Sequence, residues 1–137
     1  MKIAKEFRWE MGHRLPFHED KCKNLHGHSY KMMVEFTGTE DENGMVLDYY
    51  EVKEIIAPLV DELDHSFMVY EKDTKMIDFL VEMDMKHLVT PFHSTAENMV
   101  HYFLKKISEA NLPKNITAVM VKVFETESTY AEDEIKL

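Results

Sequence analysis

The stretch Leu25-His-Gly-His-Ser-Tyr-Lys-Met-Met-Val-Glu-Phe-Thr-Gly38 decides how this chain folds and where its chemistry lies. Its apolar residues alternate with polar ones, which predicts a strand over 25–38. Side chains on a strand point alternately to two faces, so His26 and His28 share one side with the apolar row. A second alternating segment predicts an upstream strand over 3–14, and that strand brings His13 to the same spot.

Three imidazoles at one point are typical of a transition-metal site. Three protein ligands leave a fourth position open, as in catalytic rather than structural zinc sites. Imidazole-only ligation favours Zn2+ and leaves other transition metals open. Cys22 lies in the polar loop just upstream, between Lys21 and Lys23. A lone cysteine is usually a small apolar residue, but nearby cations favour the thiolate, so Cys22 is a candidate general base or nucleophile.

Composition restricts the class of protein. A length of 137 residues predicts one domain, residues 1–137, and 45% hydrophobic residues suffice for a core. The net charge of −10 argues against nucleic acid or an anionic membrane as a partner. One cysteine and the absence of a long apolar run favour a reducing, cytoplasmic location.

The remaining pattern predicts helices followed by further strands. Asp48 is placed to cap a helix that ends at Leu63, and Ser94-Thr-Ala-Glu97 has the form of a capping box that opens another helix. Weaker signals are a helical patch from Asp73 or Thr74, a short strand over 87–89, a strand over 116–126, and a polar tail over 128–137 with a brief strand near Tyr130. Two strands, then helices, then strands indicate an α+β fold with an antiparallel sheet.

Two further places are candidates for chemistry. Asp64 and His65 follow a helix end, where the carboxylate can orient the imidazole for proton transfer, although a polar helix terminus is equally ordinary. Glu125 falls on the apolar row of the strand over 116–126, where an unpaired carboxylate costs several kcal/mol. It is therefore solvated beyond an early strand end, or it awaits a ligand with two parallel N–H donors. Glu97 is explained by the capping box alone.

These motifs together resemble the 6-pyruvoyl-tetrahydropterin synthase / 6-carboxy-5,6,7,8-tetrahydropterin synthase family. The matching residues are His13, Cys22-x3-His26-Gly-His28, Gly44-x3-Asp48, Leu63-Asp-His65, Thr95-Ala-Glu-Asn98 and Phe124-Glu-Thr126. The short spacing from Cys22 to the His-Gly-His unit resembles the bacterial 6-carboxytetrahydropterin synthases of queuosine biosynthesis. Two features depart from the family: Ser94 stands where Pro is frequent, and the segment 70–92 is long.

The resemblance implies a tunnelling fold, or T-fold. A four-stranded antiparallel sheet would carry two main helices on one face. Three subunits would join their sheets into a barrel, and two such rings would stack into a homohexamer, a dimer of trimers. Active sites would lie between subunits.

The resemblance also assigns roles. His13, His26 and His28 would bind zinc, Cys22 would be the general base, and Asp64 with His65 would form a second proton-transfer pair. Glu125 would hold the pterin edge, with Thr95 and Glu97 lining the pocket. Arg14, Lys23 and Lys31 are candidate triphosphate contacts.

The implied activity is that of a zinc-dependent lyase. It would convert 7,8-dihydroneopterin triphosphate to 6-carboxy-5,6,7,8-tetrahydropterin, releasing triphosphate and acetaldehyde. The alternatives are a 6-pyruvoyl-tetrahydropterin synthase, a non-catalytic pterin- or purine-binding protein, and a structural metal module.

Overall fold

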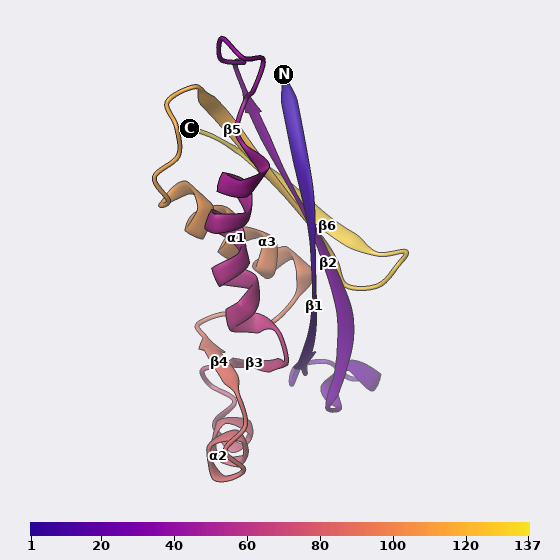
Figure 1. Cartoon of the computed structure of the whole chain (residues 1–137). Helices are drawn as coiled ribbons and strands as arrows, with labels where there is room; N and C mark the ends of the chain where they lie inside the picture. Colours follow the sequence, from indigo (N-terminus) through magenta and orange to yellow (C-terminus); the bar gives the residue numbers. More distant parts are fainter.

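The computed structural model describes residues 1–137 and contains one curled, six-stranded sheet with three α-helices (Figure 1). Along the chain the elements are β1 (Lys2–His13), the 3-10 turn η1 (Lys21–Lys23), β2 (His26–Gly38), α1 (Tyr49–Leu63), β3 (Ser66–Tyr70), α2 (Thr74–Glu82), β4 (His87–Thr90), α3 (Ala96–Ser108), β5 (Ile116–Phe124) and β6 (Tyr130–Lys136). The strands lie in the order β4-β3-β1-β2-β5-β6.

The α+β class is confirmed, but the expected four antiparallel strands and two main helices are too few. The antiparallel part is present as β1-β2-β5-β6. The additional elements are β3, which precedes the long segment 70–92, and α2 and β4, which lie within it; β3 pairs in parallel with the end of β1, and β4 pairs in parallel with β3. Parallel neighbours need a crossover, which α2 provides. The sheet is therefore mixed, with a short parallel extension at one end.

Helices α1 and α3 cover one face of the sheet (Figure 1). The core lies between them and the apolar row of each strand, with Met32, Val34 and Phe36 of β2 fully buried at its centre. The row predicted for 25–38 is therefore correct, and it is the row that begins with His26 and His28. None of the helices is long and apolar enough to cross a membrane.

Both predicted helix starts are present, and one differs in detail. The side chain of Asp48 caps α1 by accepting from the N–H of Tyr50. Helix α3 begins one residue later than the capping box requires, because Thr95 is its N-cap and accepts from the N–H of Asn98 at 3.3 Å. The predicted capping box is thus wrong. Glu97 is exposed, and its side chain does not take the role in helix capping that the motif predicts.

The ends of other elements also shift. Strand β5 ends at Phe124 instead of residue 126, and β6 is a full strand rather than a brief one. Strand β3 was not expected at all, because its five residues carry too little alternation to distinguish a strand from a loop.

Candidate metal and catalytic site

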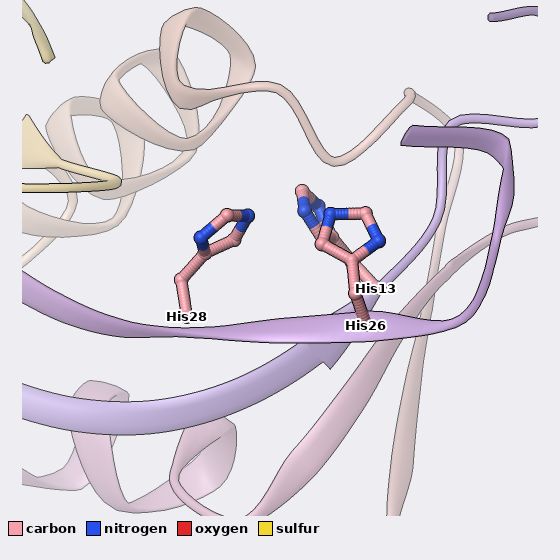
Figure 2. A group of neighbouring side chains, drawn as sticks. All are labelled: His13, His26 and His28. Carbon is pink, nitrogen blue, oxygen red and sulfur yellow. The ribbon is translucent and has the colours of Figure 1, made fainter. Parts of the chain in front are cut away.

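The three predicted metal ligands come together at the junction of β1 and β2. His13 is the register partner of His26, and Met11 is the partner of His28, so the three histidines stand on one face. Figure 2 shows their rings gathered on the same side of the two strands. One nitrogen from each lies within 4.8 Å of the others. This separation suits three imidazole ligands that share one ion.

Hydrogen bonds fix the orientation of two of these rings. The Nδ1 of His13 lies 2.9 Å from the carbonyl oxygen of Ser94 and 3.0 Å from its hydroxyl. The Nδ1 of His26 lies 2.7 Å from the carbonyl oxygen of Asn24. A carbonyl only accepts, so each Nδ1 carries the proton and each Nε2 keeps its lone pair, as a metal ligand requires.

The free nitrogens have no other use within the chain. The Nε2 atoms of His13 and His28 are buried and lack any hydrogen-bond partner. Burial of a polar atom without a partner costs about 1–3 kcal/mol. A cation at the centre of the triad would satisfy both atoms, so the residues present fit a bound metal.

Burial keeps the imidazoles of His13 and His28 neutral. Burial lowers the pKa of His13 to about 4, and this outweighs the hydrogen bond to Ser94. Burial also lowers the pKa of His28, although the negative charge of Glu125 opposes the shift. Neutral rings are the form that binds a metal, so no proton has to be displaced from them near pH 7.

Glu125 faces this site. Glu125 directly follows Phe124, the last residue of β5, and one of its carboxylate oxygens lies 3.7 Å from the Nε2 of His28. The side chain is 27% exposed, so it lies between the core and solvent rather than fully in either. Because His28 is neutral near pH 7, the contact is polar rather than an ion pair, and the carboxylate stays available to a ligand.

A pocket of about 310 Å³ joins the three predicted substrate-binding residues. Its lining residues are Leu15, Thr95, Ala96, Glu97, Glu125, Thr129 and Tyr130. Thr95, Glu97 and Glu125 come from two parts of the chain that are far apart in sequence. The pocket offers two carboxylates and sits beside the metal triad, since Glu125 contacts both.

Asp64 and His65 form a pair, but on the opposite face of the sheet. The Nδ1 of His65 lies 3.0 Å from an Asp64 carboxylate oxygen, and Asp64 also accepts from the N–H of Glu10 at 2.9 Å. The bond from Glu10 holds the pKa of Asp64 below its usual range. His65 lines a pocket of about 520 Å³ with Glu10, Gly12 and Ser29, and His28 is also among the residues that line it.

Two residues that line this pocket, Glu10 and Ser29, alternate along their strands with the metal ligands. The side chain of Glu10 therefore points away from the face that carries His13, and that of Ser29 points away from the face that carries His28. The Asp64–His65 pair and the metal triad of one chain are therefore on different sides of the sheet.

Cys22 lies in η1 and is partly exposed. Its thiol is not part of the group of ligand atoms that the three histidines form. Its carbonyl oxygen accepts from the N–H of Leu15 at 2.8 Å, which folds the loop back on itself. The cysteine therefore lies outside the set of candidate metal ligands.

Two other residues differ from what the sequence indicates. Arg14, a candidate triphosphate contact, is engaged by Asp73 through two hydrogen bonds. The sequence offers Ser94 as part of a capping box and as a departure from the proline frequent in the family, yet the residue is 2% exposed and orients His13. A buried serine directly before a helix cap was the only signal, and its partner is 81 residues away.

The molecule is thus an α+β domain with a candidate metal site of three histidines on its sheet, next to a pocket lined by two carboxylates. The chain belongs to the 6-pyruvoyl tetrahydropterin synthase family, whose family model matches residues 2–135. This confirms the resemblance seen in the motifs.

Curated relatives and solved structures agree with this membership. The chain is 30% identical to the 6-carboxy-5,6,7,8-tetrahydropterin synthase of Haemophilus influenzae and 33% identical to that of Aquifex aeolicus, each comparison covering 96% of both chains. Its fold is similar to a catalytic-residue mutant of Plasmodium vivax 6-pyruvoyltetrahydropterin synthase, with a TM-score of 0.80 and 20% identity over 100% of this chain and 98% of that one. The Caenorhabditis elegans 6-pyruvoyl tetrahydropterin synthase gives a TM-score of 0.69 at 24% identity, covering 100% of this chain and 95% of that one.

Proposed function

We propose that this chain is a zinc-dependent lyase that converts 7,8-dihydroneopterin triphosphate to 6-carboxy-5,6,7,8-tetrahydropterin, with release of triphosphate and acetaldehyde, in queuosine biosynthesis. The observation that carries the proposal is the buried pair of unpartnered Nε2 atoms on His13 and His28, beside Glu125. The names of the relatives from Haemophilus influenzae and Aquifex aeolicus support the carboxy product over the pyruvoyl one.

His13, His26 and His28 hold the metal in this proposal. A zinc ion at that place supplies Lewis acidity, which makes the side-chain hydroxyls of the substrate and the neighbouring C–H bonds more acidic. The neutral state of His13, whose pKa burial lowers to about 4, keeps the triad ready for a cation.

Glu125 and its pocket orient the substrate. A carboxylate accepts two parallel hydrogen bonds from the 2-amino and N3–H groups of a pterin, and such charge-assisted bonds are the strong ones. Thr95 and Glu97 line the same pocket and define its rim. The ring would thus be held at one end while its side chain extends towards the triad.

Protons are moved by residues from two places. Cys22 acts as the general base. The Asp64–His65 pair, with its 3.0 Å contact, acts as the second proton carrier. Since the pair and the triad are on opposite faces within one chain, the proposal takes His65 from another subunit of a homo-oligomer, with the active sites between subunits.

The test is turnover of 7,8-dihydroneopterin triphosphate by the zinc-loaded protein and by a Cys22→Ala variant. The wild type should release triphosphate, and the variant should lose turnover while it retains one equivalent of zinc. Full activity of the variant contradicts the assignment of the base. A pterin-binding protein without catalysis would bind a pterin tightly and release no triphosphate.

A further inference from the structure

The loop that carries Cys22 contacts one particular segment of the chain at two places. We call residues 14–24 the cysteine loop and residues 70–93 the insert; the insert contains α2 and β4. In Figure 1 both lie at the same end of the sheet, where α2 projects from the body. The proposed function assigns the insert no role.

The first contact is an ion pair between Arg14 and Asp73. The guanidinium Nε and one terminal nitrogen of Arg14 donate to the two carboxylate oxygens at 2.7 and 2.6 Å. The side chain of Asp73 is only 6% exposed and that of Arg14 is 28% exposed. Asp73 occupies the N-cap position of α2, yet its side chain makes no capping bond. The carboxylate of Asp73 therefore binds Arg14 of the cysteine loop and does not cap its own helix.

The second contact is a cluster of three aromatic rings. The ring of His93 meets Phe17 of the cysteine loop edge-on, at a centroid distance of 4.6 Å and an interplanar angle of 69°, and Tyr70 of the insert in a tilted arrangement, at 4.0 Å and 40°. The Nδ1 of His93 is buried and has no hydrogen-bond partner. The imidazole therefore acts here through its faces and edges, which hold Phe17 against the insert.

These contacts reach Cys22 through the loop itself. The N–H of Leu15 donates to the Cys22 carbonyl at 2.8 Å, and the N–H of His18 donates to Leu15 at 2.9 Å. Leu15 lies between the two anchored residues, Arg14 and Phe17. Holding that short stretch therefore holds the carbonyl of Cys22.

The same segment also ends at the metal site. Ser94 directly follows His93, and its carbonyl oxygen orients the ring of His13. The backbone of His93 is fixed as well, because its carbonyl accepts from the N–H of Thr95 at 2.8 Å and from the side chain of Asn98 at 2.9 Å. One rigid stretch thus contacts both the cysteine loop and a metal ligand.

We infer that the insert positions Cys22 relative to the metal triad, with Asp73 and His93 as positioning residues. The inference rests on the proposed function only in taking Cys22 as the reacting group. Neither Asp73 nor His93 lines the pocket that contains Glu125. Their loss should loosen the cysteine loop and misplace the thiol, while the triad and the pterin pocket remain intact.

The experiment compares Asp73→Asn and His93→Ala with two matched controls, Asp78→Asn on the exposed side of α2 and His101→Ala on the exposed side of α3. Amide hydrogen exchange is followed in the peptide spanning residues 15–24, together with zinc content, kcat and KM. Exchange should become about tenfold faster in both test variants and kcat should fall by about tenfold, the change expected on losing one partly buried contact. KM, zinc content and both controls should remain unchanged.

A His93→Phe variant tests whether the aromatic contacts of His93 are what matters. Phenylalanine keeps an aromatic ring next to Phe17 and Tyr70, so this variant should show the slow exchange and the kcat of the wild type, unlike His93→Ala. If His93→Ala fails to fold, Phe17→Ala removes the same contact from a side chain that is 57% exposed. The inference is overturned if exchange stays within twofold of the controls both in Asp73→Asn and in His93→Ala, or in Phe17→Ala where that variant replaces it. Because exchange requires no turnover, this outcome is independent of whether the proposed reaction is correct.

Discussion

Lowering the pH should reduce the free energy of unfolding of the metal-free protein, and part of that loss should come from His13 alone. Burial lowers the pKa of His13 to about 4 from the ordinary 6.5. As the pH falls below 6.5, the imidazole of His13 becomes protonated in the unfolded chain but stays neutral in the folded chain. The free energy of unfolding therefore falls with pH across this window and stops falling below the folded pKa. Between pH 7.5 and pH 4.5 the contribution amounts to about 2.5 kcal/mol.

Urea unfolding of the chelator-treated wild type and of a His13→Gln variant at these two pH values measures this contribution. The wild type should lose about 2.5 kcal/mol more than the variant, because glutamine does not titrate. Carboxylates and His28 titrate in both proteins, so their effects cancel in the comparison. Equal losses in the two proteins would refute the argument that burial holds His13 neutral.

Three further outcomes follow from the same geometry. Ser94→Ala removes the hydroxyl but keeps the carbonyl bond to the ring of His13, so zinc affinity in a chelator competition should drop by about tenfold, and an unchanged affinity would count against this role. Glu125→Gln should weaken pterin binding by about 10- to 100-fold in a fluorescence titration, with zinc content unaltered; loss of zinc instead would make Glu125 part of the metal site. Gly27→Ala would place a Cβ 2.9 Å from the carbonyl oxygen of Met11, so the Tm should drop as the protein loses about 1–3 kcal/mol of stability, and an unaltered Tm would show that β1 and β2 can separate freely.

The metal triad was predictable because it depends on local rules. Side-chain alternation places His26 and His28 on one face, and two successive strands usually pair, which adds His13. Glu125 was predictable for a related reason, since a carboxylate at the end of an apolar row stands out without any knowledge of its partner.

The rest depends on contacts between distant parts of the chain. Strands β3 and β4 are short, and their parallel pairing is set by the crossover through α2. The role of Ser94 depends on His13, which lies 81 residues away, and the capping-box pattern gave a competing explanation that proved wrong.

The face of the sheet on which the Asp64–His65 pair lies also could not be predicted from the sequence. It follows from how the chain leaves α1, where His65 adopts a left-handed φ of 54° and its N–H bonds to the carbonyl of Glu10. The sequence indicates that a carboxylate and an imidazole adjoin, but not which face they reach. Their pairing at 3.0 Å was itself left open by sequence adjacency.

The most direct test of the proposed reaction is identification of its products. The zinc-loaded wild type is incubated with 7,8-dihydroneopterin triphosphate, and the mixture is analysed by mass spectrometry with a separate assay for acetaldehyde. The account predicts 6-carboxy-5,6,7,8-tetrahydropterin and one acetaldehyde for each triphosphate released. Triphosphate release with a 6-pyruvoyl product and no acetaldehyde would contradict it.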